Sequence, residues 1–153
     1  MKKLFYIIFF FLPVVVFPQW TWQNPLPQGN DLTSVHFADA NTGYSVGNSG
    51  TILKTIDGGV SWTLLSSGTN NRLESVFFCD VSTGFAVGEN GIILKSTDGG
   101  TTWVIVPSGK TKNLNSVFFC NCSIGYIAGN SGTVLKTIDG GGYLECSIKR
   151  NYQ

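Results

Sequence analysis

Three aspartates, Asp57, Asp98 and Asp139, recur every 41 residues and are the first candidates for chemistry. A row of carboxylates could supply general acids and bases, or it could bind calcium. The sequence contains no Asp-x-Asp-x-Asp-Gly calcium loop, and equivalent positions on three repeats cannot converge on one site. We therefore predict that the chain has no catalytic, cofactor-binding or metal site and is not an enzyme.

The residues around each aspartate indicate a structural role. Two glycines follow each aspartate, and in the first two repeats a tryptophan stands three positions after the second glycine. An aspartate at the head of a hairpin accepts hydrogen bonds from backbone N–H groups of its own turn. The glycines permit positive φ, and the tryptophan covers the turn. The predicted structural residues are Asp57, Gly59, Trp62, Asp98, Gly100, Trp103, Asp139 and Gly141.

The chain has one histidine, His36, and it occupies the repeat position of Phe77 and Phe118. This equivalence favours a structural residue over a base or a metal ligand. Lysines also recur in register, at the positions Lys54, Lys95 and Lys136. They could form a ring that attracts an anionic partner, but we expect solvated lysines at strand edges that oppose aggregation.

Four cysteines need separate treatment because the chain has the features of an exported protein. Cys79 and Cys120 are repeat equivalents, and Ala38 fills the same position in the first repeat. Equivalent positions on neighbouring repeats should lie beyond the ~7 Å Cα limit for bridging, so a 79–120 disulfide is not expected. Cys120 and Cys122 lack the spacing of a zinc site, and Cys146 lies in the atypical C-terminal segment.

The composition excludes some classes of partner. The net charge is +1 and 12% of the residues are charged, so no electrostatic surface for nucleic acid or anionic membranes is expected. The 19 glycines and the 13% aromatic content suit many short strands joined by tight turns.

Each repeat divides into four segments of strand length. In the second repeat these are residues 73–79, 84–88, 92–96 and 101–106, with a tight turn at 89–91. Four antiparallel strands per 41 residues predict an all-β fold, a partial β-propeller of about three four-stranded blades. The repeats are 32–72, 73–113 and an incomplete 114–141, preceded by an N-terminal strand and loop at 19–31 in which Trp20–Asn24 resembles a last strand.

The motif Ser/Thr-x-Asp-x-Gly-x-x-x-Trp resembles the Asp box of bacterial-neuraminidase-type repeats. The wider pattern, carried by Gly43–Gly47, Gly84–Gly88 and Gly125–Gly129 with the Asp-Gly-Gly turns that follow them, resembles the propeller family of photosystem II stability and assembly factors. That resemblance implies a module for protein binding or scaffolding, with an unknown protein or a surface glycan as partner. The family's assembly factors use an arginine-containing face, whereas this chain has only Arg72 and Arg150.

The alternative is a fragment of an exported Asp-box glycoside hydrolase, sialidase-like, with its catalytic residues outside this chain. A sialidase needs three arginines around its substrate carboxylate, and two arginines cannot supply them. A glycosidase needs paired carboxylates. Glu74 and Glu89 lie in different strand segments and are expected to be solvated.

Residues 1–18 have the pattern of a signal peptide. Lys2 and Lys3 precede an apolar run, Leu4–Phe17, that is shorter than the ~20 residues of a membrane-spanning helix. We expect export to a periplasmic, cell-surface or secreted location, with no stable membrane span in the mature chain. An uncleaved N-terminal anchor is the alternative.

Residues 142–153 depart from the repeat. If Leu144 is encoded TTG, a reading frame shifted by one base would place a tryptophan at the position of Trp62 and Trp103. We hypothesise a frameshifted fragment of a longer propeller, with natural divergence of the C-terminus as the alternative. Three blades cannot close a ring, so an oligomeric or aggregation-prone chain is expected.

Overall fold

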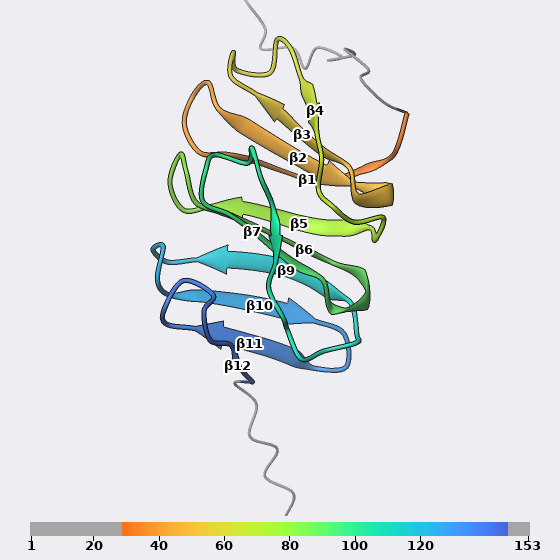
Figure 1. Ribbon diagram of the computed structural model, residues 1–153, viewed down its shortest axis with the longest axis vertical. Coiled ribbons are helices and arrows are strands. Elements are labelled where there is room, and N and C mark those ends of the chain that lie inside the picture. Colours follow the sequence, from red (N-terminus) through yellow and green to blue (C-terminus); the bar gives the residue numbers. More distant parts are fainter. Residues whose placement is uncertain (1–28, 147–153) are drawn as a thin grey trace, which may run out of the picture.

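The computed structural model describes residues 29–146, which form three four-stranded antiparallel sheets stacked on one another (Figure 1). We call these sheets blades 1, 2 and 3; in each blade, strands that follow one another in the chain are hydrogen-bonded neighbours. The predicted all-β partial propeller is therefore confirmed. Blade 1 contains β1 (Leu32–Phe37), β2 (Gly43–Gly47), β3 (Ile52–Thr55) and β4 (Thr63–Leu65); blade 2 contains β5 (Leu73–Phe78), β6 (Gly84–Gly88), β7 (Ile93–Ser96) and β8 (Val104–Ile105); blade 3 contains β9 (Leu114–Phe119), β10 (Gly125–Gly129), β11 (Thr133–Thr137) and β12 (Glu145–Cys146).

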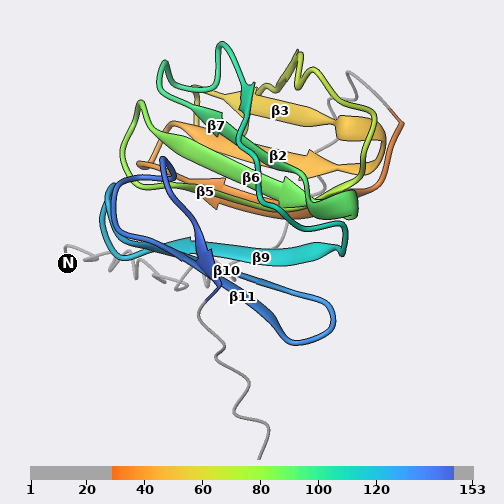
Figure 2. The same ribbon diagram turned by 60° about the horizontal axis from the view of Figure 1, so that its bottom comes forward.

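Blade 2 contributes side chains to two separate cores, because each of its two faces packs on a different neighbouring blade. Val76 and Phe78 are buried against blade 1, whereas Phe85 on the next strand is buried against blade 3. The first strands of the blades also contact one another in series, β1 with β5 and β5 with β9 (Figure 2). Burying each such side chain contributes about 1.5–3 kcal/mol, so the stacking of blades supplies most of the apolar stabilisation.

Short 3-10 turns follow the second strand in blades 1 and 2, η1 (Asn48–Gly50) and η2 (Glu89–Gly91). The backbone takes a positive φ at the middle residue and at the glycine of each turn, 57° at Asn90 and 72° at Gly91. At Gly91 a Cβ atom would overlap the Lys110 carbonyl, so only glycine fits. These are the turns at which the sequence predicts positive φ.

The last strand of blade 3 comes from the segment for which the sequence predicts no repeat structure. Glu145 pairs with Lys136 in β12, as Val104 pairs with Lys95 in β8. Leu144 packs against the second core at the repeat position that Trp103 holds in blade 2. Residues 147–153, the expected signal peptide at 1–18 and the expected strand Trp20–Asn24 lie outside the described residues. Within residues 29–146, no helix has the length and apolar character needed to cross a bilayer.

A disulfide joins Cys79 of blade 2 to Cys122 of blade 3, with Cα atoms 5.2 Å apart. Cys120 is free and exposed, so the expectation that 79 and 120 do not pair is confirmed. The bridge itself was not predicted from the sequence. The partner of Cys79 is not its repeat equivalent but a residue two positions further along the chain, in the loop that follows β9.

The bridge between blades gives a stability prediction with a matched control. One repeat earlier, Ala38 holds the position of Cys79 and Val81 holds the position of Cys122. The double substitution Cys79→Ala/Cys122→Val therefore introduces residues that the fold already accommodates at equivalent positions. For a sequence separation of 43, we expect the double variant to lose about 2–4 kcal/mol of unfolding free energy in urea denaturation. Cys120→Ser should change the unfolding free energy by no more than about 0.5 kcal/mol. Equal urea midpoints of unfolding for the double variant and for the parent with its disulfide formed would contradict a stabilising bridge.

Candidate functional site

Each Asp-box aspartate accepts hydrogen bonds within the turn between the third and fourth strands of its blade. In blade 2, Asp98 Oδ1 accepts hydrogen bonds from the Thr102 backbone N–H (2.9 Å) and from the Ser96 hydroxyl (2.8 Å). Its other oxygen accepts the Thr102 hydroxyl at 2.6 Å, and Ser96 Oγ accepts the Gly100 N–H at 2.8 Å. We call these four hydrogen bonds, which hold the turn in place, the Asp-box clasp. Asp57 and Asp139 make the equivalent backbone bonds, to Ser61 and Tyr143.

These hydrogen bonds lower the pKa of the aspartates. The hydroxyl of Thr102, then its N–H, lowers the pKa of Asp98 from 3.8 to about 2, and Ser61 does the same to Asp57. The pKa of Asp139 is also lowered, mainly by the Tyr143 N–H, because tyrosine at this position provides no hydroxyl to the carboxylate. A carboxylate held ionised in this way is a poor proton carrier near neutral pH, which suits a structural role.

The glycines of the turn allow the preceding blade to approach closely. Gly100 has φ of 79°, and a Cβ atom there would lie 2.8 Å from Tyr44 Cε1 of blade 1. Trp103 then packs edge-on against Phe78, with ring centroids 5.8 Å apart. The Asp box therefore shapes a surface that faces the neighbouring blade. The structural role of the eight Asp-box residues stays a prediction.

The lysines connect the blades, and the prediction of solvated strand-edge residues is wrong for two of them. Lys54 Nζ donates to the Gly99 carbonyl at 2.7 Å, and Lys95 Nζ donates to the Gly140 carbonyl at 2.7 Å. Each ammonium group also lies 5.6 Å from the centroid of an aromatic ring on its own blade. We call this set of contacts the inter-blade clamp: a lysine of one blade donates to the carbonyl of the first Asp-box glycine of the next blade, and an aromatic ring of the lysine's own blade lies beside the ammonium group.

The clamp between blades 1 and 2 has an additional hydrogen bond. The Tyr44 hydroxyl donates to the Gly99 carbonyl at 2.9 Å, and the Tyr44 ring stacks on Phe78 at 3.6 Å. Burial raises the pKa of Tyr44 to about 12, and the nearby charges of Asp39 and Asp98 add to the shift. Between blades 2 and 3, Phe85 stacks on Phe119 at 4.1 Å without a hydroxyl.

His36 belongs to the same interface, in agreement with its predicted structural position. Its Nε2 lies 3.0 Å from the Phe78 carbonyl, and its ring lies 4.6 Å from that of Phe77. Burial lowers the pKa of His36, which favours a neutral imidazole that donates its Nε2–H. Glu74, which the sequence analysis expects to be solvated, pairs with Arg72 at 3.3 Å.

A second repeated motif, with an aspartate or asparagine in each blade, was not predicted from the sequence. Asp39 and Asp80 each accept two backbone N–H groups in the turn between the first and second strands, at 2.6–2.7 Å. Asn121 does the same in blade 3 at 2.9 Å. The 41-residue period of Asp39, Asp80 and Asn121 is the signal that would have revealed them. Asp80 also lies close to the Cys79–Cys122 bridge, but the two sulfurs bond each other and offer no thiolates to a metal in this state.

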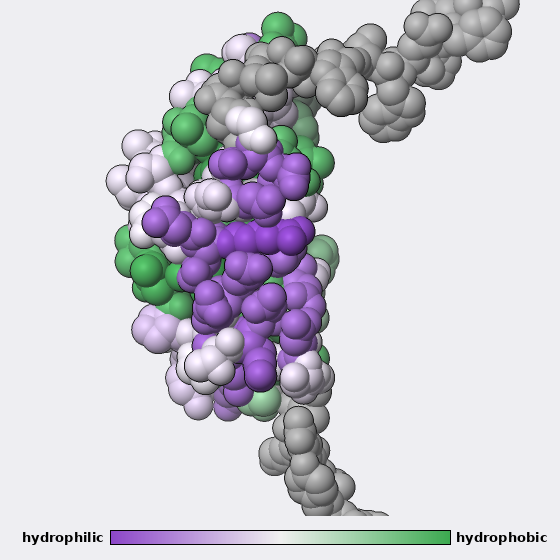
Figure 3. All heavy atoms as spheres, turned by 90° about the vertical axis from the view of Figure 1, so that its right-hand side faces the viewer, coloured by the Kyte–Doolittle hydropathy of each residue, from purple (hydrophilic) through white to green (hydrophobic). Residues whose placement is uncertain are grey.

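The opposite edge of the blades carries the 3-10 turns and the loops between blades, and it is largely hydrophilic (Figure 3). Asparagine side chains hold this edge together: Asn90 donates to Asn71 at 3.2 Å, and Asn115 donates to Asn130 at 2.7 Å. Amide side chains both donate and accept, so this edge suits recognition of peptide groups.

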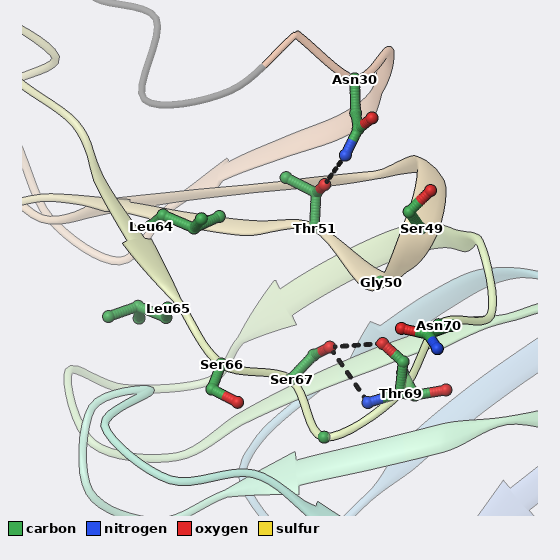
Figure 4. A pocket seen from close by; sticks show the side chains of 11 residues that line it. Asn30, Ser49, Gly50, Thr51, Leu64, Leu65, Ser66, Ser67, Thr69 and Asn70 are labelled. Carbon is green, nitrogen blue, oxygen red and sulfur yellow. Dashed lines mark hydrogen bonds between the residues drawn. The ribbon is translucent and has the colours of Figure 1, made fainter.

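An open pocket of about 330 Å³ lies on this edge of blade 1 (Figure 4). Ser67 Oγ and Thr69 form a hydrogen-bonded turn on one side, and Asn30 donates to Thr51 Oγ1 at 2.9 Å on the other. None of the lining residues is titratable, so the pocket offers no general acid or base. The lining residues are Asn30, Ser49, Gly50, Thr51, Leu64, Leu65, Ser66, Ser67, Gly68, Thr69 and Asn70.

Comparisons with known proteins agree with this architecture. The family model described as photosynthesis system II assembly factor YCF48 matches residues 13–112. The structure is similar to "YCF48 bound to D1 peptide", with 26% identity over 82% of this chain and a TM-score of 0.74. It is also similar to YCF48 from Cyanidioschyzon merolae, with 24% identity over 84% of this chain and a TM-score of 0.68. The chain spans only 42% and 46% of those two proteins.

The fold also matches a glycoside hydrolase. The GH74 enzyme of Niastella koreensis has 22% identity over 77% of this chain and a TM-score of 0.62, and the chain spans 22% of it. At this identity the likeness shows the fold alone. A comparison with curated proteins finds no match.

The Asp-box clasp gives a pH prediction. Because the folded pKa of Asp98 lies below its ordinary value of 3.8, the clasp stabilises the fold above that pH. The stabilisation is lost as the pH falls through about 2. Thr102→Ala removes the largest cause of the shift and should raise the pKa of Asp98. Tyr143→Ser supplies the missing hydroxyl and should lower the pKa of Asp139.

Carboxyl chemical shifts followed by NMR across the acid range measure both effects. Thr101→Ala is the matched control, because Thr101 donates to the Asp98 backbone carbonyl and not to its carboxylate. An unchanged pKa of Asp98 in Thr102→Ala would contradict the clasp.

Proposed function

The chain belongs to the photosynthesis system II assembly factor YCF48 family, and we propose that it is a non-catalytic propeller module that binds an extended segment of another protein. The observation that carries this proposal is the likeness, at 26% identity, to a YCF48 structure that holds a D1 peptide. The chain spans less than half of that protein, so the proposal concerns a module and not the whole activity.

The pocket on blade 1 supports peptide binding. It combines two apolar side chains, Leu64 and Leu65, with the hydroxyls of Thr51, Ser67 and Thr69. A peptide needs both kinds of group, because apolar surface contacts its side chains and hydroxyls hydrogen-bond its backbone. Leu64 is 48% exposed, so its side chain is accessible to a ligand. The lack of titratable lining residues supports binding over catalysis at this site.

The alternative, a fragment of an exported glycoside hydrolase, gains less support. The GH74 likeness concerns the fold, and four of the described carboxylates already have structural partners. Asp57, Asp98 and Asp139 hold the Asp-box turns, and Glu74 pairs with Arg72. A surface glycan as partner has no observation of its own in favour.

We also propose that the protein is exported. The pattern of residues 1–18 supports this proposal, and so does the Cys79–Cys122 bridge, because disulfides persist mainly in oxidising compartments.

A titration with a synthetic D1 peptide tests the binding function. Leu64→Asp places a charge in the pocket and should weaken the affinity roughly tenfold or more, in line with about 1.4 kcal/mol or more of lost apolar contact. The matched control is Ile105→Asp, at the same repeat position on blade 2, 57% exposed and outside the pocket. It should leave the affinity within about twofold. Failure of the parent chain to bind would overturn the proposed function, and equal losses in the two variants would overturn the pocket as its site.

A fusion experiment tests export. Residues 1–28 joined to alkaline phosphatase, which becomes active only where its disulfides form, should give active enzyme in a bacterial host. Replacement of Ile8 and Phe10 by arginine breaks the apolar run and should abolish the activity. Active phosphatase from both fusions, or from neither, would contradict a signal peptide in this segment.

A further inference from the structure

The same interface occurs twice within the chain, and each end of the stack presents one half of it. Blade 1 meets blade 2, and blade 2 meets blade 3, through stacked aromatic rings and a lysine on a glycine carbonyl. A third contact also repeats: the Val76 N–H donates to Ser34 Oγ at 3.4 Å, and the Val117 N–H donates to Ser75 Oγ at 3.3 Å. The interface is therefore defined by a ring, a lysine and a serine from one blade.

Blade 3 presents all three of these groups on its outer face. Tyr126, Lys136 and Ser116 hold the repeat positions of Tyr44, Lys54 and Ser34. Tyr126 is 38% exposed, and neighbouring Phe118 is 55% exposed. Lys136 Nζ already lies over the Tyr126 ring, at 5.9 Å, in the arrangement that the other two lysines adopt in the inter-blade clamp.

Blade 1 presents the complementary groups on its own outer face. Phe37 holds the position of Phe78 and Phe119 and is 41% exposed; Val35 holds that of Val76 and is 61% exposed. Gly58 is the first glycine of the blade 1 Asp box, the residue whose carbonyl the clamp contacts in blades 2 and 3. Its φ of 69° matches the 68° of Gly99, so the turn already has the required shape.

We propose that the chain associates head to tail with a second copy of itself, blade 3 of one copy packing on blade 1 of the next through a third inter-blade clamp. In this contact Lys136 and Tyr126 donate to the Gly58 carbonyl of the second copy. The Tyr126 ring stacks on Phe37 of that copy, and Ser116 accepts the Val35 N–H. Head-to-tail contacts of this kind either close into a ring or continue as an open assembly.

The disulfide supplies a geometric test of this contact. Cys79 and Cys122 form the bridge between blades 2 and 3. Cys120 of blade 3 is the repeat equivalent of Cys79, and Ala40 of blade 1 is the repeat equivalent of Cys122. Cys120 is already a free, exposed thiol. In the proposed assembly it faces Ala40 of the next copy as Cys79 faces Cys122 within the chain.

The experiment introduces Ala40→Cys into the full chain that also carries Cys146→Ser, which removes the other free thiol. Mild oxidation should convert most of the protein into disulfide-linked species of twice the chain mass or more. Adding Cys120→Ser should abolish them. Absence of a cross-link that depends on Cys120 would overturn the proposal and would mean that another part of the chain or another protein covers these faces.

Sedimentation of the chain without added cysteine tests the contact in the absence of a covalent bond. Lys136→Glu removes the donor to the Gly58 carbonyl and should weaken self-association roughly tenfold or more. Lys112→Glu makes the same charge change at an exposed residue in the loop between blades 2 and 3 and should leave the association within about twofold. A monomeric parent chain, or equal effects of the two substitutions, would overturn the proposal. Neither outcome depends on peptide binding, so this inference and the proposed function fail independently.

Discussion

A blade of this fold has two apolar faces and can bury neither of them alone, and the remaining structure follows from that constraint. Blade 2 places Phe78 in one core and Phe85 in the other, so each neighbour covers one of its faces. The largest fully buried side chains, Tyr44 and Phe85, lie between sheets and not within one. Because apolar burial is the dominant stabilising contribution, a blade without neighbours would lack most of the stabilisation that stacking provides.

The Asp box connects the solvent-exposed turn to this buried interface. Asp98 is exposed, but its hydrogen bonds fix the turn in which Gly99 presents its carbonyl to Lys54 and Tyr44. Gly100 then lies where a side chain would collide with the Tyr44 ring. A change at the exposed carboxylate therefore acts on a contact between two blades, although the aspartate itself touches only its own turn.

Contacts within a blade could be predicted from the sequence, and contacts between blades could not. The strands, the positive-φ turns and the hydrogen bonds of Asp57 and Asp98 involve residues a few positions apart, where alternation and turn chemistry apply. Three of the contacts between blades join residues 42 to 45 positions apart: His36 with Phe78, Cys79 with Cys122, and Lys54 with Gly99. Alignment at the 41-residue period pairs equivalent residues, whereas these three contacts join residues that are offset from equivalence by one to four positions. This offset explains why the disulfide and the role of the lysines were missed.

The two interfaces within the chain contain different additional contacts. The exposed face of blade 3 has residues that match both of them. Between blades 1 and 2 the Tyr44 hydroxyl adds a hydrogen bond to the lysine contact. Between blades 2 and 3 that hydroxyl is missing at Phe85, and a disulfide is present instead. The outer face of blade 3 again has a tyrosine beside its lysine, and Cys120 stands at the position that forms the bridge. A tyrosine, a phenylalanine and a free thiol stand exposed on that face in the register that the two internal interfaces use. This repetition of the register, more than the exposure of any one side chain, is the reason to propose that the face packs on another blade.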